Sequence, residues 1–375
     1  MKTTFKFLKL CGAIVVALLL SGTAAMCMPT EAAELVKPVV FSLSLLASFV
    51  AGSPALLFAG NVDMTDLAAS LTDQALEAKT DLYMTIVDDS AYDFFTVIPD
   101  VLDEVPLTQM LMDRILQPGG KKTFDPKAAL SFKNRMGKVR NAKVDLQFTP
   151  EDIETMRRSW LGIMYKSKNT LTPDNFPFSQ YILDRVVKQF ALDLKYAKIK
   201  GVYNAAGTAA IDVMDGLLTL VDADVTALNI PAANVFTGAA ITSSNAVAQF
   251  EGVGHKPYGS QFYSKVPMIM LAAPENILNY ELNFRSTFGS LPYNLGFDKK
   301  TIYGTNIELV AVEDMIGSDR LIVTQKENLI DLMDDPSNMG NIIIEKEKRN
   351  INIMMDIREG VNYAIAETIW TNDLD

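Results

Sequence analysis

Few side chains in this sequence of 375 residues could support the common chemistries of enzymes. The chain has one histidine, His255, and two cysteines, Cys11 and Cys27, both in the first thirty residues. The rest of the chain therefore has no means of forming a disulfide, a catalytic thiol or a zinc site built from several histidines and cysteines. His255 has no evident catalytic partner in the sequence, and we interpret it as a loop histidine.

Four carboxylates near the middle of the chain are the remaining catalytic candidates. Asp212, Asp215, Asp222 and Asp224 are close in sequence, but acid–base catalysis needs paired groups with tuned pKa values. Asp215 directly precedes a glycine, which is typical of a turn or a helix cap. We therefore expect these four residues to have structural roles.

Two other segments faintly resemble ligand sites. Gly119–Thr123 lacks the leading glycine and the Gly-Lys-Ser/Thr order of a phosphate-binding loop. Asp88–Glu104 has six acidic residues, but their spacing is not that of a calcium-binding EF-hand loop. We interpret this acidic segment as a solvated, extended arm with aromatic anchors. The sequence thus favours a protein that is not an enzyme and that needs no cofactor or metal.

A long amphipathic helix is the clearest structural element in the chain. Apolar residues recur at helical spacing over Phe178–Lys200, and polar residues fall mostly on the other side. We expect Asp174 or Asn175 to cap this helix and Gly201 to end it. Lys198 and its neighbours suit the negative end of the helix dipole. At about 1.5 Å per residue, the helix would span roughly 30–35 Å.

Charge is unevenly distributed along the chain. The formal net charge is −11, but residues 1–60 are net positive, so the remainder is more acidic than the total. An acidic body disfavours nucleic-acid binding, which needs a basic surface. It suits a soluble protein that is kept apart from like copies until assembly.

A basic segment, Lys121–Thr149, departs from this acidic character. We predict two strands, Ala129–Met136 and Val139–Phe148, that turn around Gly137 and pair as an extended β-hairpin. One interpretation is a nucleic-acid-binding ribbon. We favour a hairpin that docks on the acidic surface of a neighbouring copy, because opposite potentials favour docking and an isolated hairpin is marginally stable. The candidate subunit-contact residues are Lys133, Arg135, Lys138, Arg140 and Lys143.

The first sixty residues resemble a targeting segment. Basic residues precede an uncharged apolar run, Leu10–Leu20, and Thr23–Ala25 supplies the small residues of a cleavage site. A second uncharged run, Val39–Ala59, is nearly long enough to cross a bilayer, but serines, a glycine and a proline interrupt it. Residues 1–60 are therefore either a removable leader with a buried or discarded apolar segment, or a membrane anchor.

The other expected elements alternate between helices and strands. The span Val235–Ser264 is rich in small residues and is predicted to be a long surface excursion. Further helices are predicted over Asn61–Lys79, Leu107–Leu116 and Leu217–Leu228, after Thr149, and from Pro274 through Phe284. Strands are predicted over Val266–Ala272, Ile307–Val312 and Leu321–Thr324.

The last thirty-five residues have a strong β pattern. Apolar Ile351, Ile353, Met355 and Ile357 alternate with mostly polar residues. We expect Glu359-Gly360 to turn the chain into a second strand, and the charge run Glu345–Arg349 to be a solvated strand end.

In their order along the chain, four groups of residues resemble the major capsid protein of tailed bacteriophages, the Hong Kong ninety-seven-type fold. The resemblance covers roughly residues 64–370. The segments are Val266–Leu271 followed by Ala273–Asn276, Thr301–Ile307, Leu321–Thr324 followed by Lys326–Leu329, and Ile357–Tyr363.

The resemblance implies an α+β fold with a peripheral domain built on a long spine helix, here Phe178–Lys200, and a central domain. The implied boundaries are 1–60 for a leader or pro-segment, 61–118 for an N-terminal arm, 119–150 for the extended β-hairpin loop, 151–203 with 325–360 for the peripheral domain, and 204–324 with 361–375 for the central domain.

The resemblance also implies a function, that of a structural protomer. Such a protein tiles hexamers and pentamers into an icosahedral shell around double-stranded DNA, in the host cytoplasm, without a cofactor. A scaffold, a maturation protease and a portal are possible partners, and packaged DNA would be contacted non-specifically.

A signal-like leader is foreign to this family. Residues 1–60 are a pro-segment, a start assigned too early with Met64 as the true beginning, or a real export signal. The last case would make the protein an exported or membrane-anchored surface binding protein of the cell envelope.

Overall fold

The computed structural model describes residues 63–112, 116, 126, 130–166, 177–259, 266–291, 300–334 and 342–374. The chain divides into two compact units, Met1–Asp63 with Met164–Asn175, and Met64–Ile163 with Phe176–Asp375. Nearly all described residues belong to the second unit. The predictions for residues 1–60 and for Gly119–Thr123 lie outside the described residues.

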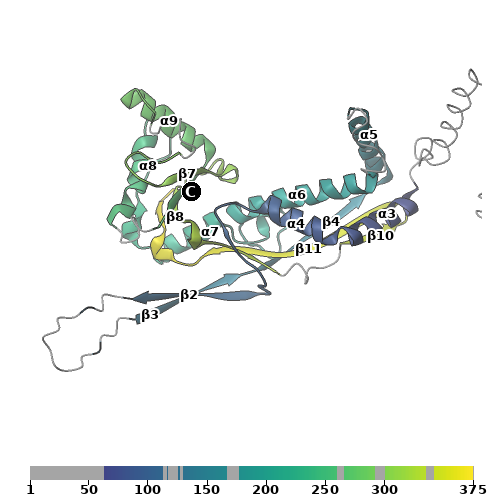
Figure 1. Ribbon diagram of the computed structural model, residues 1–375, viewed down its shortest axis with the longest axis horizontal. Helices are drawn as coiled ribbons and strands as arrows, with labels where there is room; N and C mark the ends of the chain where they lie inside the picture. Colours follow the sequence, from purple (N-terminus) through teal and green to yellow (C-terminus); the bar gives the residue numbers. More distant parts are fainter. Residues whose placement is uncertain are drawn as a thin grey trace, which may run out of the picture. The chain divides into compact units, whose positions relative to one another are not determined.

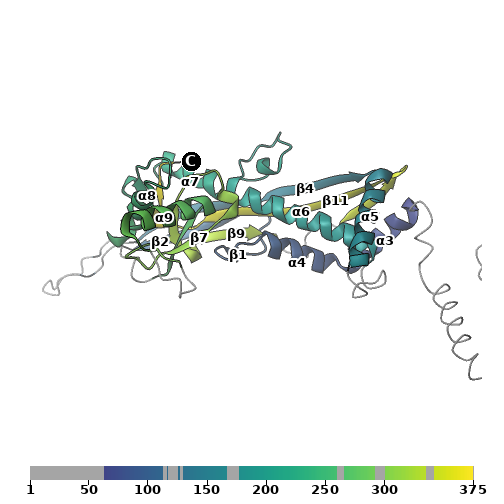
Figure 2. The ribbon, with the colours of Figure 1, turned by 90° about the horizontal axis from the view of Figure 1, so that it is seen from above.

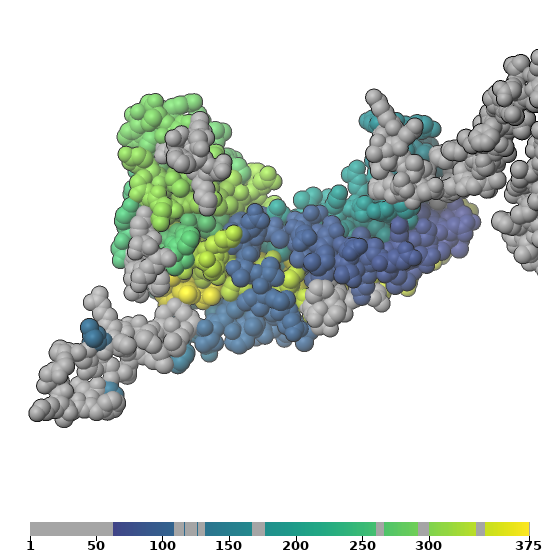
Figure 3. Space-filling model, viewed as in Figure 1, coloured from purple at the N-terminus to yellow at the C-terminus, as the bar shows by residue number. Residues whose placement is uncertain are grey.

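A long helix organises one half of the second unit. Helix α6 (Phe178–Lys200) has the predicted bounds and ends at Gly201, which donates its N–H to Ala197 O. Its N-cap position is held by Pro177 rather than by Asp174 or Asn175, since the backbone of Pro177 is already extended there. Helices α3 (Met64–Glu77) and α4 (Lys79–Ser90) contact α6, and lie on one face in purple and blue (Figure 3). Helix α5 (Pro150–Lys166) begins after Thr149, as predicted.

A five-stranded sheet packs beside these helices, with β11 at its centre (Figure 2). β11 pairs with β4 from Ile351 opposite Phe148 to Glu359 opposite Arg140. The predicted alternation is confirmed, because Ile351, Ile353, Met355 and Ile357 are all buried. The strands are β1 (Thr96–Ile98), β4 (Arg140–Phe148), β9 (Leu329–Met333), β10 (Ile343–Glu347) and β11 (Asn350–Tyr363).

The turn predicted at Glu359-Gly360 is wrong. β11 continues to Tyr363, because the backbone of its last five residues pairs with β9. Gly360 is needed there for close approach rather than for a turn, since a Cβ atom would lie 2.1 Å from Lys138 O. The charge run, in contrast, is the exposed strand end that we expected, with β10 pairing to the start of β11.

A second five-stranded sheet and three helices form the other part of the unit (Figure 1). The strand order is β5-β12-β8-β6-β7. The strands are β5 (Val235–Phe236), β6 (Met268–Ala272), β7 (Glu308–Ala311), β8 (Ile322–Gln325) and β12 (Trp370–Asn372). The helices are α7 (Leu217–Thr226), α8 (Ala246–Gly254) and α9 (Pro274–Phe288).

Helix α8 corrects the prediction of a surface excursion over Val235–Ser264. Phe250 and Val253 are fully buried, and the Phe250 ring stacks on Tyr280 of α9 with centroids 4.9 Å apart. The small residues of this span allow the helix to pack closely on α9 and the sheet. Short 3-10 helices occupy Ala210–Asp212, Ala232–Asn234, Lys256–Gly259, Glu313–Met315, Lys326–Asn328 and Ala366–Thr368.

The acidic segment before the ribbon is partly as predicted. Phe94 and Phe95 are buried in the core and anchor the extended chain that leads into β1, whereas Asp88–Ser90 complete α4. Among the described residues, no helix is long and apolar enough to cross a membrane.

A two-stranded antiparallel ribbon contains β2 (Glu104–Met112) and β3 (Leu130–Lys138). The helix predicted over Leu107–Leu116 is therefore wrong, because most of that segment pairs with β3. The predicted pairing of β3 with β4 is also wrong. Val139 is buried and donates its N–H to Asp103 O, so the chain passes directly from the ribbon into the first sheet.

Candidate subunit-contact site

The β2–β3 ribbon presents two chemically different faces. Because side chains of a strand alternate, the even-numbered residues of β3 point one way and the odd-numbered ones the other. Phe132 and Met136 are exposed, by 61% and 44%, and share the outward face with Lys138. Gly137 points inward, where a Cβ atom would lie 2.6 Å from a methyl group of Leu332.

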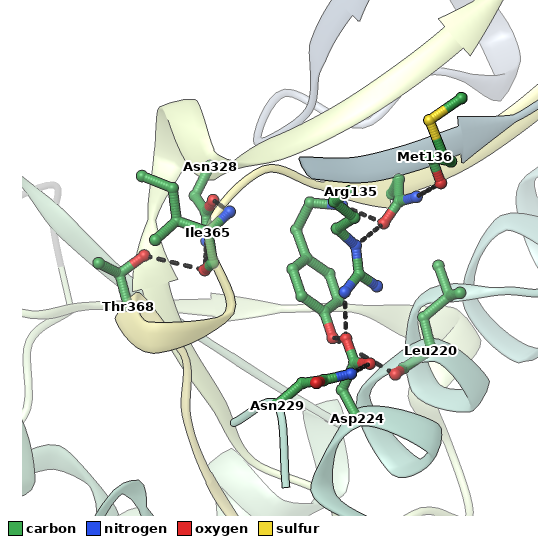
Figure 4. A network of polar contacts seen from close by, with 10 residues as sticks. Arg135, Met136, Leu220, Asp224, Asn229, Asn328, Ile365 and Thr368 are labelled. Atoms are coloured by element: carbon green, nitrogen blue, oxygen red, sulfur yellow. Dashed lines mark hydrogen bonds and ion pairs between the residues drawn. The ribbon is translucent and has the colours of Figure 1, made fainter. Parts of the chain in front are cut away.

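Arg135 anchors the inward face to the body of the protein (Figure 4). Its Nε donates to Asn362 Oδ1 at 2.5 Å, and its guanidinium lies 3.9 Å from the centroid of the Tyr363 ring. The same guanidinium forms an ion pair with Asp224 of α7. Tyr363 also donates its hydroxyl proton to Asp224, and Asn229 donates to the other carboxylate oxygen at 2.8 Å.

The contacts in this network affect the pKa of Tyr363 and provide partners for the Asp224 carboxylate. Burial raises the pKa of Tyr363 well above its usual range, and Asp224 adds to that effect while Arg135 opposes it. The phenol therefore stays a proton donor at physiological pH. The Asp224 carboxylate is bound by a guanidinium and two further donors, and through them it connects α7 to the ribbon and to β11.

A second contact fixes the ribbon nearer its outer end. Lys133 forms an ion pair with Glu367, which lies in the turn that follows β11. Asn328 holds this turn, because its side chain donates to Ile365 O at 2.9 Å and accepts from Ile365 N at 2.7 Å (Figure 4). The ribbon is thus attached to the turn as well as to α7.

All five candidate contact residues have partners within their own chain. The Arg135 side chain is only 20% exposed, and it is committed to the Asp224 network. That these residues contact a neighbouring copy stays a prediction. The other partners are Glu367 for Lys133, Glu104 for Lys138 at 2.8 Å, Asp145 for Lys143 at 2.7 Å, and the Tyr203 ring for Arg140 at 4.0 Å.

The remaining carboxylates considered for catalysis also hold the fold together. Asp212 accepts from Ala209 N at 2.9 Å, and Asp215 accepts from Tyr203 N at 3.0 Å. Asp222 forms an ion pair with Arg320. Among the described residues, no group of three or more histidine, cysteine, aspartate and glutamate side chains is placed to hold a metal ion.

A groove of about 780 Å³ lies between β4, α6 and the loop 203–213. Phe190 and Leu194 are among its lining residues, together with four aspartates, Asp145, Asp193, Asp212 and Asp356. Two of these acids are already engaged, since Asp145 binds Lys143 and Asp193 accepts from the Gln189 amide at 2.9 Å. The groove therefore has the size and the negative charge of a binding site, but we assign no pair of its acids to catalysis.

Sequence reasoning missed a buried cluster at the end of α6. Lys198 Nζ lies 2.7 Å from Asp331 Oδ2 and 2.9 Å from Glu359 Oε2, and it donates to Ser90 Oγ at 3.2 Å. The sequence placed Lys198 only among the cations at the negative end of the helix dipole, and the structure shows that its side chain is buried between two acids. The available signal was its place four residues after Leu194, within the apolar stripe of the helix.

Comparisons with known proteins give the fold a context. No protein-family model matches the chain, and no curated protein sequence matches it. The structure of the satellite phage P4 procapsid with its size-determination protein is similar, with a TM-score of 0.52 and 13% identity over 78% of this chain and 90% of that chain. The capsid of cyanophage A-1(L) has a TM-score of 0.50 and 10% identity over 77% and 92% of the two chains.

The chain has the fold of tailed-phage capsid proteins. The α+β capsid fold predicted from the sequence is thereby confirmed, with α6 as its spine helix and β2–β3 as its extended hairpin loop. The predicted domain boundaries stay predictions. The hairpin, however, is formed by Glu104–Lys138, so it begins earlier in the chain than residue 119.

Proposed function

We propose that this protein is a structural protomer that assembles into hexamers and pentamers of an icosahedral phage capsid enclosing double-stranded DNA. The single observation that carries the proposal is the capsid fold, shared over most of the chain with the phage P4 procapsid and the cyanophage A-1(L) capsid. The protomer works by packing against its copies, so it performs no catalysis and needs no cofactor.

The outward face of the ribbon supports this role. Phe132 and Met136 leave apolar surface in water, and Pro106 is exposed opposite Met136 on the same face. A two-stranded ribbon is only marginally stable by itself. Its inner face is held by Arg135, and its outer face needs another surface to cover it. In a shell, a second copy of the chain supplies that surface.

The lysines of the basic segment add positive charge on and near the ribbon, with Lys138 on its outward face, Lys133 on the other face and Lys143 in β4. Lys133, Lys138 and Lys143 keep 63%, 54% and 72% of their side-chain surface exposed despite their internal partners. An acidic neighbouring copy attracts them, and the attraction guides docking more than it adds affinity. Arg135 and Arg140 act instead within the chain, on Asp224 and on the Tyr203 ring.

The remaining parts of the proposal concern partners and location. The protomer assembles in the host cytoplasm, with a scaffold, a maturation protease and a portal as partners, and contacts packaged DNA non-specifically. Its arm begins at residue 61 and ends where β2 of the hairpin loop begins, at Glu104. Its peripheral domain contains residues 151–203 and 325–360, and its central domain contains residues 204–324 and 361–375. No observation on the described residues favours an exported surface protein.

Paired substitutions at one ribbon position test the proposal. Phe132→Asp places a charge on the outward face, whereas Phe132→Leu keeps it apolar. We expect the full-length wild-type chain and Phe132→Leu to sediment as large particles, and Phe132→Asp to stay as capsomers or single chains with an unchanged circular dichroism spectrum. Equal assembly of all three would show that the outward face is not a subunit contact. Absence of particles for the wild type would contradict the proposed function itself.

A further inference from the structure

Three charged side chains meet in the interior of the protein, with one positive charge for two negative ones. The exposed fractions of the Lys198, Asp331 and Glu359 side chains are 1%, 4% and 0%. Both ion-pair distances are short, at 2.7 and 2.9 Å. Burying an ion pair removes the hydration of both charges, and their mutual attraction only partly offsets this loss of free energy. A second carboxylate with no cation of its own costs considerably more.

The nearby cations are engaged elsewhere. Arg358 donates to Asn141 at 2.9 Å and lies 3.8 Å from Asp334. Arg140, which is opposite Glu359 in the β4 register, lies over the Tyr203 ring. Lys200, two residues after Lys198, donates to a backbone carbonyl at the surface. Within the described part of the chain, the second carboxylate therefore has no second cation.

Among the described residues, the charged groups that act on the two acids are Lys198 and, for Glu359, Asp331. α4 contributes the Ser90 hydroxyl, which accepts a hydrogen bond from Lys198. Met333 is the β9 residue opposite Glu359. Asp331 Oδ1 and Glu359 Oε1 have no hydrogen-bond partner among the described residues. A buried carboxylate oxygen without a partner favours the protonated, neutral form of its group, and a nearby like charge adds to that preference.

The cluster occupies a junction of the fold. Lys198 is in the last turn of the long helix α6, Asp331 is in β9, and Ser90 ends α4. Glu359 is the one β11 residue whose register partners include both Arg140 of β4 and Met333 of β9. A change in charge here therefore acts on α6, α4, β9 and β11 together.

We propose that Lys198, Asp331 and Glu359 form a buried proton-binding site that holds one proton on its carboxyl groups and locks α6 to β9 and β11. When the pH rises and this proton leaves, two buried carboxylates face one ammonium group, and the junction loosens. The site is independent of the proposed shell function, because it acts within a single chain.

The titration behaviour supports this assignment and sets its sign. Burial raises the pKa of Glu359 to about 7, while Lys198 opposes the rise and Asp331 adds to it. Burial also raises the pKa of Asp331. A glutamate in the unfolded chain titrates at about 4.3. The folded state thus binds this proton more tightly, so the stabilisation is complete at low pH and is lost as the pH rises through about 7.

Hydrogen exchange of the full-length chain tests the site. After correction for intrinsic exchange rates, we expect the backbone amides of β11 and of the last turn of α6 to exchange faster at about pH 8.5 than at about pH 5.5. Glu359→Gln keeps the shape of the protonated side chain, so its protection should be the same at both pH values. The exposed β10 variant Glu345→Gln, the matched control, should behave as wild type. Equal pH dependence in Glu359→Gln and wild type would overturn the proposal.

Two further measurements cover other outcomes. If Glu359→Gln does not fold, infrared spectroscopy of the wild type reports directly on the site, through a protonated-carboxyl band at low pH that disappears by about pH 8.5. A band that is absent throughout would overturn the proposal. Replacing sodium and potassium chloride with choline chloride at high pH should leave protection unchanged. Loss of protection in choline would identify a metal cation, rather than a proton, as the occupant.

Discussion

The Arg135 guanidinium lies 3.9 Å from the centroid of the Tyr363 ring, so a residue of the extended ribbon rests on the final residue of the longest strand. Asp224 of α7 binds both partners. Ribbon, sheet and α7 are therefore joined at one buried point. The direction in which the ribbon leaves the body, and with it the placement of Phe132, depends on this contact.

Arg135→Lys should weaken the ribbon anchor. Lysine keeps a positive charge near Asp224, but it loses the planar stack on Tyr363 and the Nε hydrogen bond. We expect the free energy of unfolding of the unassembled chain to fall by about 1–3 kcal/mol in urea titrations. Lys133→Gln is the control, because exposed ion pairs contribute only about 0–1 kcal/mol. Equal losses for the two variants would contradict a special role for Arg135.

Tyr363→Phe tests the contribution of the hydroxyl separately from that of the ring. The phenylalanine keeps the surface under Arg135 but removes one donor to Asp224, which should cost about 1–2 kcal/mol of unfolding free energy. Combined with Arg135→Lys, the losses should not add, with a coupling of about 0.5–3 kcal/mol, because both residues bind one carboxylate. Strict additivity in this double-mutant cycle would show that the two contacts act independently.

Gly360→Ala should damage the sheet at its junction. The new Cβ atom would lie 2.1 Å from Lys138 O, a backbone atom at the end of β3, which pairs there with Glu104 of β2. We expect a loss of more than about 2 kcal/mol, or failure to fold. Gly162→Ala in α5 is the matched control, since nothing lies within 4 Å of its Cβ position, and it should stabilise the helix by about 0.5–1 kcal/mol. A thermal melt checks both predictions, because the midpoint of unfolding should fall for Gly360→Ala and rise for Gly162→Ala.

Lys198→Met removes the only described cation of the buried cluster. Breaking a buried ion pair from one side typically costs about 3–5 kcal/mol. Because Asp331 and Glu359 then both favour the protonated form, the loss should be larger at high pH than at low pH. Lys200→Met, whose lysine donates to a surface carbonyl, should cost little at any pH. A pH-independent loss in Lys198→Met would argue that only packing had been disturbed.

Local patterns predicted the elements whose periodicity is carried by many residues. The apolar spacing over Phe178–Lys200 gave α6 its bounds, and the alternation from Ile351 to Ile357 identified β11 as half-buried. The sequence did not reveal which strands pair with one another. The single residue Val139 separates β3 from β4, a length that suggests a hairpin turn, yet β4 pairs with a strand about two hundred residues later. Only the packing of the whole chain decides between such partners.

Isolated composition signals were overridden by tertiary structure. Glu359-Gly360 has turn-like composition, but ladder bonds to β9 keep it extended. The segment after Leu107 was predicted as a helix, and pairing with β3 makes it a strand. The buried cluster joins residues 198, 331 and 359, and no local spacing reveals their proximity. Of the candidate contact residues, three lie in β3 of the ribbon and two in β4, and the sequence did not distinguish the inward Arg135 from the outward Lys138.

Electron cryomicroscopy of particles formed by the full-length chain tests the central claim most directly. The account predicts closed icosahedral shells in which α6 and β11 fit the density of each subunit and a neighbouring copy covers the face that carries Phe132 and Met136. A chain that stays monomeric under all assembly conditions would contradict it, as would shells that leave this face open to solvent.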